Sequence, residues 1–203
     1  LPTEEKVANM LKGTSRKPDE IVGKMAAHTA MPGENAVEIF EHWSYTVRTV
    51  AINAVMAGAK PEYLPVLLAV ASTGKEAMSV SDNSFTEGLI INGPIRKEIG
   101  LNYGIGALGP FNYANAVIGR AWTLMSINFG DARAGDTFMA TIGNGLSFTN
   151  QCCAENEAKS PWKPYHARQG FKPEESTVSI FRGWNVLTLG IGTTDGLLQQ
   201  IRS

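Results

Sequence analysis

The chain has 203 residues, of which 43% are hydrophobic and 18% are charged, and its formal net charge at pH 7 is −1. This length suits one main domain. Because about a quarter of the residues in an average globular protein are charged, the low charged content indicates that a partner covers part of the surface. The absence of a long run of Lys or Arg argues against a nucleic-acid-binding protein.

The sequence contains no segment that is apolar enough to span a bilayer. The apolar segments 47–59 and 64–71 are shorter than the required span of about 18 uncharged residues, and charged residues separate them. The two cysteines, Cys152 and Cys153, are adjacent and cannot form a secreted disulfide framework, and no signal-peptide pattern opens the chain. We therefore expect a cytoplasmic protein that binds neither membranes nor nucleic acid.

Residues 1–43 are predicted to form a polar helical arm or linker that needs a partner to pack against. Residues 3–12 suit a short helix, with Thr3 as N-cap and Gly13 as its end. A second short helix is predicted from Asp19 to Met25.

Residues 44–203 are predicted to form the main domain, which opens with two helices joined by a tight connection. Apolar residues recur at helical spacing from Tyr45 to Gly58, where the glycine ends the helix. A second helix is predicted from Pro61 to Gly74.

Strands and further helices follow in the second half of the chain. A strand is predicted over 85–91, because an apolar run there is closed by the turn Asn92-Gly93-Pro94. Other candidates are strands over 146–151 and 177–181, which 184–189 extends or follows, and a last helix from residue 194 or 195. Helices and strands that do not alternate strictly indicate an α/β or α+β fold, with a layered mixed sheet and packed helices.

The stretch from Ile99 to Gly130 is expected to be largely buried, because its only charged residue is Arg120. Its second half, 111–127, is predicted to be a helix. One stripe of this helix carries small residues that permit the close approach of a backbone or a ligand: Asn112, Asn115, Ala116, Gly119, Thr123 and Ser126.

Reactive side chains are densest in residues 152–166, which hold both cysteines, Glu155, Glu157 and His166. These are the residue types that serve as nucleophiles and proton carriers. A thiol reacts as its thiolate, and the two carboxylates disfavour that form unless a cation balances them. One or both cysteines as core residues is therefore an equal alternative. Because strand residues alternate between faces, at most one of the pair can line a pocket.

A metal site is a weaker alternative for the same segment. It would use a cysteine, Glu155 or Glu157, and His166, with His28 or His42 from the arm. No Cys-x-x-Cys or His-x-x-x-His spacing supports it, so no residue is assigned as a metal ligand.

A binding site for a carboxylate or phosphate is predicted between the turn at residue 92 and the start of the long helix. The free N–H groups and the dipole of a helix N-terminus favour an anion. The candidate ligands are Asn92, Gly93, Arg96, Lys97 and Asn112. Arg120 is either a buried counter-charge or an ion-paired or surface arginine.

The segment Gly104–Gly109 matches the glycine pattern of dinucleotide-binding proteins, and Asp131 has the position of a ribose-binding acid. The residues before Gly104 make a poor strand, however, and Pro110 would lie inside the expected helix. Nicotinamide or flavin binding is therefore the weakest alternative, and the cofactor stays unknown.

Three phrases of the sequence resemble a family of uncharacterised bacterial proteins: 53–58 leading into 61–65, then 92–98, and 154–157 with 160–162. Members of this family are similar to partners, or fused halves, of a small domain with a Cys/Sec-Gly-Ser-Cys (UGSC) motif. The resemblance covers most of residues 44–182, and the motif itself does not occur in this chain. It implies a shared site with a UGSC-type subunit or segment, and it names no reaction.

We predict an enzyme, or the substrate-binding subunit of an enzyme, that acts on a small anionic organic molecule. The site would combine the loop 92–97, the helix start at 111 and the segment 152–166. Glu155 or Glu157 would be the general acid/base, a cysteine the nucleophile or ligand, and His166 the proton carrier. The alternatives are a non-catalytic structural subunit of a homo- or hetero-oligomer, and a nicotinamide- or flavin-dependent oxidoreductase.

Overall fold

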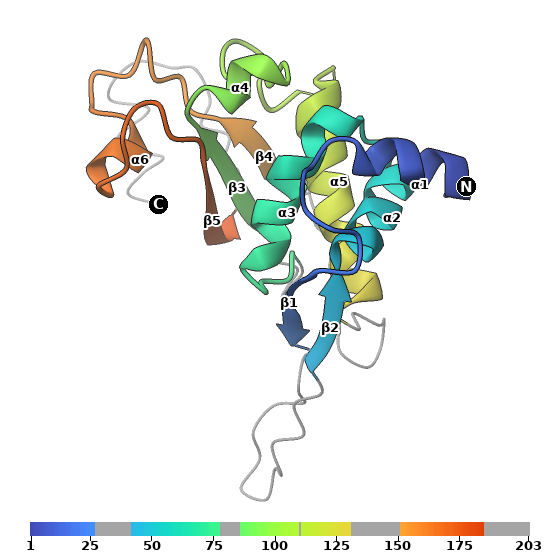
Figure 1. Ribbon diagram of the computed structural model, residues 1–203. Coiled ribbons are helices and arrows are strands. Elements are labelled where there is room, and N and C mark those ends of the chain that lie inside the picture. The colour runs from blue at the N-terminus through green and yellow to red at the C-terminus, as the bar shows by residue number, and fades with distance from the viewer. Residues whose placement is uncertain (27–41, 78–85, 110, 131–150, 185–203) are drawn as a thin grey trace, which may run out of the picture.

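The structure is a computed structural model that describes residues 1–26, 42–77, 86–109, 111–130 and 151–184. Its described part contains helices, a three-stranded sheet and a two-stranded ribbon, which confirms the predicted α+β class. In Figure 1 the three-stranded sheet lies to the left of the four longer helices. Contacts order these layers as the sheet, then α3 (Leu64–Ser72) and α5 (Tyr113–Asn128), then α2 (Val47–Ala57), then α1 (Glu4–Leu11).

The four longer predicted helices are confirmed, with ends set by local signals. They are α1 (Glu4–Leu11), α2 (Val47–Ala57), α3 (Leu64–Ser72), which follows a 3-10 turn (Pro61–Tyr63), and α5 (Tyr113–Asn128). Thr3 caps α1 by accepting the N–H of Lys6. Gly58 ends α2 in the left-handed region, with φ of 87°.

The helix predicted over residues 19–25 is wrong. Strand β1 (Ile21–Ala26) occupies this place and pairs antiparallel with β2 (His42–Thr46). The reason is tertiary: the backbone of this segment is satisfied by pairing with the next described strand, which local propensity does not reveal. In its described part the predicted arm also contributes Val7, Met10 and Met25 to the same core as the other helices.

The three-stranded sheet has the order β4-β3-β5, with β3 (Thr86–Asn92) in the centre. Strand β4 (Gln151–Ala154) is parallel to β3, and β5 (Thr177–Trp184) is antiparallel to it. The strands predicted over 85–91 and 177–181 are confirmed. Residues 146–150 and 185–189 lie outside the description, as do Asp131, Pro110 and the predicted last helix.

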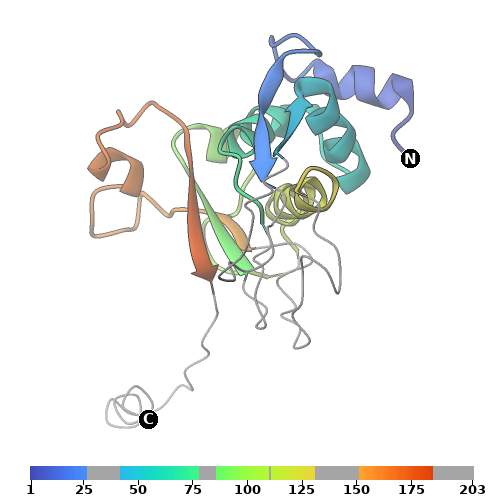
Figure 2. The same ribbon diagram turned by 90° about the horizontal axis from the view of Figure 1, so that it is seen from below.

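The face of the sheet that meets the helices is apolar. Leu89 and Ile91 of β3 pair with Cys152 and Ala154 of β4, and all four are buried. The short helix α6 (Tyr165–Arg168) lies beyond the sheet, away from the larger helices (Figure 2), and the ring of Tyr165 packs on Phe181 of β5.

Helix α5 is largely buried, as predicted, and both bulky residues and small residues of this helix lie in the core. Ile118, Trp122 and Met125 are fully buried, and the indole N–H of Trp122 donates to the Lys75 carbonyl at 2.9 Å. Ser126, from the row of small residues, accepts the N–H of Ala77 at 2.6 Å.

The expectation of burial is wrong for the segment that precedes α5. Between α4 (Ile95–Glu98) and α5, the side chains of Ile105 and Phe111 lie in solvent. Arg120 is exposed on α5, so it is not a buried counter-charge. The low charge of this stretch therefore has two causes, since one half is core and the other half is an uncharged surface.

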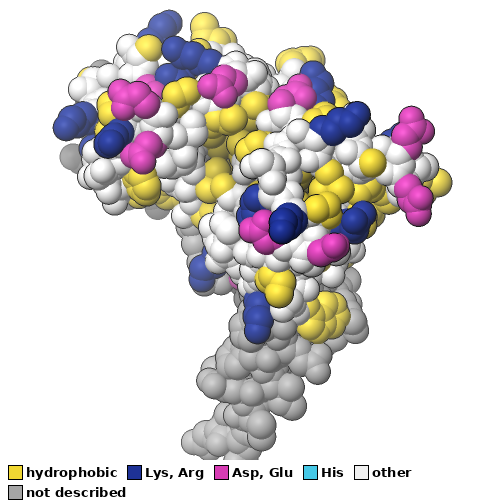
Figure 3. Space-filling model, viewed as in Figure 1, with side chains coloured by type: hydrophobic (Ala, Val, Ile, Leu, Met, Phe, Trp, Pro, Cys, Tyr) yellow, Lys and Arg dark blue, Asp and Glu magenta, His cyan; other side chains and the backbone are white. Residues whose placement is uncertain are grey.

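None of the described helices combines the length and the apolar character needed to cross a membrane. Figure 3 shows acidic and basic side chains interspersed on one face, with hydrophobic side chains between them.

Candidate functional site

The candidate site lies where the central strand ends. Asn92 is the last residue of β3, and Glu155 follows the last residue of the parallel strand β4. Because β3 and β4 are parallel, their carboxyl ends meet at the same edge of the sheet. The N–H of Glu155 continues the ladder by donating to the Ile91 carbonyl at 3.2 Å. The predicted segments 92–97 and 152–166 are therefore brought together.

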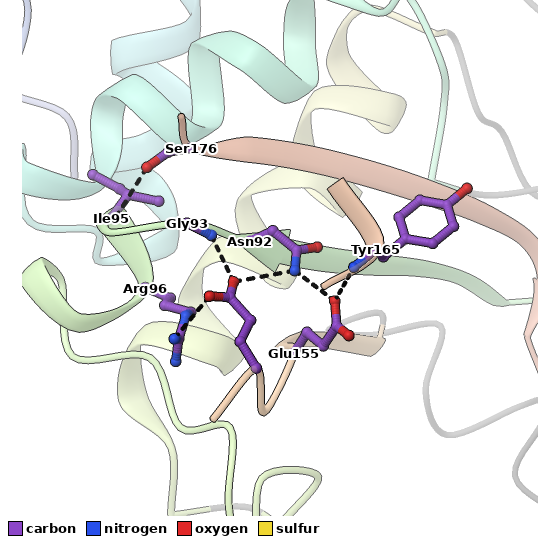
Figure 4. Close-up of polar contacts among 8 residues, drawn as sticks. Asn92, Gly93, Ile95, Arg96, Glu155, Tyr165 and Ser176 are labelled. Atoms are coloured by element: carbon purple, nitrogen blue, oxygen red, sulfur yellow. Dashed lines mark hydrogen bonds and ion pairs between the residues drawn. The ribbon is translucent and has the colours of Figure 1, made fainter. Parts of the chain in front are cut away.

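The carboxylate of Glu157 fills the predicted anion-binding turn. One of its oxygens accepts the backbone N–H of Gly93 at 2.8 Å and the side-chain amide of Asn92 at 3.2 Å. The other oxygen accepts Nη2 of Arg96 at 2.9 Å. Figure 4 shows these donors converging on one carboxylate. Three of the residues predicted to bind a substrate anion thus bind an anion that the chain itself supplies.

Several opposing effects set the pKa of Glu157. Burial acts first and would raise this pKa. The hydrogen bonds from Gly93, Arg96 and Asn92, together with the positive charge of Arg96, outweigh burial and hold the pKa below its ordinary value. Glu157 is therefore an ionised positioning residue rather than a proton carrier at neutral pH.

Glu155 belongs to the same hydrogen-bonding network. Its Oε2 accepts the side-chain amide of Asn92 at 2.6 Å and the backbone N–H of Tyr165 at 2.7 Å. The amide nitrogen of Asn92 therefore bridges the two carboxylates (Figure 4). Through Glu155 the segment that leads to α6 is fixed to the end of β3.

Gly93 allows the turn to approach β5. Its φ is 86°, which favours glycine, and an added Cβ would collide with the Glu175 carbonyl. Beside it, the N–H of Ile95 donates to the Ser176 hydroxyl at 3.0 Å. The anion-binding turn is thus held from two sides, by residue 157 and by the residues before β5.

The two thiols lie on opposite faces of β4, as strand alternation predicts. Cys152 is buried in the core beside Leu89, and Cys153 pairs with Ile90 on the partly exposed face. Burial, followed by the neighbouring Cys153, raises the pKa of Cys152 far above its usual value. Burial also raises the pKa of Cys153 to about 11. Both thiols are therefore protonated at neutral pH. Because the thiolate is the nucleophilic form, neither cysteine is well suited to act as a nucleophile.

Four residues around the network carry buried polar atoms without a partner in the described part of the chain: Asn92 (Oδ1), Arg96 (Nε and Nη1), His166 (both ring nitrogens) and Thr177 (Oγ1). They come from the elements that the network joins, since Asn92 pairs with Thr177 across β3 and β5, and His166 follows Tyr165 in α6. Buried polar groups in proteins are nearly always satisfied by protein, water or ligand. This concentration marks the place as a candidate binding site.

Arg96 is the best-positioned of these groups. Its side chain is 5% exposed, Glu157 holds Nη2, and its guanidinium lies 4.5 Å from the ring centroid of Tyr103. The guanidinium is thus fixed by an ion pair and by an aromatic contact. Its two other nitrogens have no partner among the described residues.

The other predicted site residues lie apart from the network. Asn112 bonds Asn102 and the carbonyl oxygens of the loop before α5. Lys97 and Arg120 are exposed. The start of the long helix therefore does not join the segments 92–97 and 152–166.

The described residues contain no group of three or more His, Cys, Asp or Glu side chains that could hold a metal ion. His28 lies outside the description, as does the side chain of His42. The glycine pattern at 104–109 also lacks the context of a dinucleotide site, because the residues before it, 101–103, are not a strand and α5 begins only at Tyr113.

Sequence reasoning missed Tyr103, Tyr165, Ser176 and Thr177. Thr177 opens a predicted strand, so the antiparallel register of β5 on β3 would have placed it opposite Asn92. Tyr165 and Ser176 leave no such signal, because one acts through its backbone and the other is a single hydroxyl in a loop.

Comparison of the chain with protein-family models, curated proteins and solved structures gave no match. The resemblance to the family paired with UGSC-type domains stays a prediction.

Proposed function

We propose that this chain is an enzyme, or the substrate-binding subunit of an enzyme, that acts on a small organic molecule with one carboxylate group. The observation that carries this proposal is the buried guanidinium of Arg96, which is ion-paired through Nη2 and has no described partner at Nε and Nη1. The ring of His166, buried and without a partner among the described residues, adds a second hydrogen-bonding group, next to Tyr165, whose N–H donates to Glu155.

Energetics favour a ligand at Arg96. A buried hydrogen-bonding group without a partner costs roughly 1–3 kcal/mol. A carboxylate that accepts from Arg96 would recover part of this cost. Because Glu157 and the Tyr103 ring already fix the guanidinium, little side-chain entropy is lost on binding.

The charge balance limits the class of ligand. Glu157 already neutralises Arg96, and the carboxyl group of Glu155 lies on the same amide of Asn92. A ligand with several negative charges would therefore meet more repulsion than attraction. This favours a monocarboxylate over a phosphate dianion.

The network also suggests roles in catalysis. Glu157 positions Arg96, while Glu155 and His166 are the groups proposed to move protons. The thiols are the least suited, because burial raises the pKa of both and no cation in the described part of the chain lowers it. We also propose a cytoplasmic location, in keeping with two free cysteines. A nicotinamide or flavin cofactor remains a proposal that titration with the cofactors would test.

Binding of acetate, measured by isothermal titration calorimetry and by the shift in melting temperature, tests the proposal. We expect acetate to bind the wild-type chain and Lys97→Gln, and not Arg96→Gln. Lys97 is the matched control, because it is the adjacent cation and is exposed. Inorganic phosphate should bind more weakly than acetate. Equal acetate binding by a folded Arg96→Gln variant would overturn the proposal.

Thr177→Val is a second variant for the case in which Arg96→Gln does not fold. It removes a hydroxyl that has no partner among the described residues, and no hydrogen bond of the described network. We expect a stable protein with altered acetate affinity. Unchanged affinity would place the ligand away from the β3–β5 end and count against this site.

A second candidate function is a non-catalytic subunit whose polar network is purely structural. It is favoured by Glu157, which fills the anion-binding turn itself. In that case Glu155→Gln and His166→Ala lower stability or change oligomer size, and no small carboxylate raises the melting temperature of the wild type.

A further inference from the structure

We propose that the loop before α5 is the contact surface of a homodimer, in which it packs against the same loop of a second copy of this chain. The apolar loop is defined here as residues 104–109 and 111–113. It lies between α4 and α5, includes Tyr113 as the first residue of α5, and contains no charged residue. This inference is independent of the proposed function.

Large hydrophobic side chains of the apolar loop are in solvent. Ile105 is 102% exposed, Phe111 94%, Tyr113 55% and Leu108 52%. These fractions sum to about three whole side chains, so at about 150–250 Å² for each large side chain the four expose roughly 450–750 Å² together. This range includes the upper end of the largest apolar patch on a typical monomer, about 300–600 Å². Patches at this end of the range are often functional, and one carried by a single short loop suits a partner surface.

A network of three asparagines makes the apolar loop rigid. The side-chain amide of Asn112 lies within 3.1 Å of the carbonyl oxygens of Ala107 and Gly109. Asn102 donates to Asn112 at 2.8 Å, and Asn115 donates to the Asn102 carbonyl at 3.0 Å. The loop is therefore folded around polar side chains while its apolar side chains point outward. Such preorganisation lowers the entropy cost of association.

The second copy is the occupant that best fits these observations. Two identical loops related by a twofold axis bury matching apolar surfaces, and they meet no like-charge repulsion because neither carries a charge. With these side chains fully covered in both copies, the two loops would bury roughly 900–1,500 Å², a range that includes the lower limit of about 1,000 Å² for a specific interface. Polar groups lie at the rim, where the Tyr113 hydroxyl donates to the Gly58 carbonyl and Lys60 lies 5.9 Å from the Tyr113 ring centroid.

Sedimentation velocity of the 203-residue chain over a range of micromolar concentrations tests the proposal. We expect a concentration-dependent dimer, and we expect Phe111→Ser and Ile105→Ser each to weaken dimerisation by about tenfold or more. Both positions are exposed, so the variants should unfold at the wild-type temperature. The matched control is Trp162→Ser, which removes a similarly exposed aromatic residue outside the loop, 71% exposed, and should leave the dimer unchanged.

Other outcomes would overturn the proposal. These are a wild-type chain that is monomeric at every concentration, a dimer that neither loop substitution weakens, or a dimer that Trp162→Ser weakens equally. A monomer that binds phosphatidylcholine vesicles through Phe111 would assign the loop to a lipid surface instead. A monomer that requires a different protein at this loop would assign it to a heteromeric contact.

Discussion

Glu157 and Arg96 form an ion pair at 2.9 Å in which the two side chains are only 14% and 5% exposed. An ion pair shielded from water is strongly coupled, and removal of one partner leaves the other charge without compensation. The pair therefore connects the segment after β4 to α4, and it fixes the geometry of the candidate site.

Glu157→Gln should lower the free energy of unfolding by about 2–3 kcal/mol, because a buried guanidinium loses its counter-charge. Urea denaturation followed by circular dichroism measures this change. The control is Glu62→Gln, which removes an exposed ion pair with Lys60 at 4.0 Å and should cost less than about 0.5 kcal/mol. Equal losses for the two variants would show that the pair is not structural.

Stability should fall in acid through Glu157. Its pKa in the folded protein is lowered, so its contribution to stability is present above the pKa of the unfolded chain, about 4.3, and is lost as the pH falls toward the lower folded pKa. Free energies of unfolding should be measured from about pH 7 down to about pH 3. As the pH falls, they should decline more steeply for the wild type than for Glu157→Gln. Parallel curves would contradict the assignment.

Both thiols should react slowly with iodoacetamide in the native protein at neutral pH. Burial raises the pKa of Cys153 to about 11 and that of Cys152 further, so the reactive thiolate is scarce. Mass spectrometry should find Cys153 labelled first, because it is the more exposed of the two, with a rate that increases as the pH rises toward 11. Rapid labelling at neutral pH that acetate suppresses would instead support a thiol nucleophile.

Gly93→Ala should destabilise the protein more than Gly170→Ala. Both glycines have a positive φ, 86° and 94° respectively, so both substitutions introduce backbone strain of about 1–2 kcal/mol. Only the methyl group at residue 93 meets another part of the chain, the backbone at Glu175 and Ser176, whereas residue 170 is open within 4 Å. The difference between the two melting temperatures measures the close approach of the turn to β5.

Local signals were sufficient for most of the helices. The stop at Gly58 and the start at Pro61 depend on residues within one turn of the boundary, and so does the cap at Thr3. Strand β1 was missed because the signal for a strand there is its pairing with β2. Helix ends that depend on nearby residues were predictable, and a strand that depends on pairing with another strand was not.

Part of the candidate site was predictable from the sequence, but four of its residues were not, and neither were the roles of the predicted ones. Sequence identified Asn92, Gly93 and Arg96 as anion binders, and Glu155 and Glu157 as reactive carboxylates. It did not show that the carboxylates are the bound anions, because the direction of a side chain depends on the register of β3 and β4. The exposed loop was missed for a related reason, since a lack of charge does not distinguish a core segment from an uncharged surface.

The parallel pairing of β3 and β4 determines when the site can form during folding. Asn92 and Glu155 are 63 positions apart, and Gly93 and Glu157 are 64 apart. Contacts across so long a loop form late, because the closure entropy precedes any compensating interaction. Helix α5 lies within that loop and packs against β4. The hydrogen-bonding network around Asn92 is therefore completed only after most of the chain has folded.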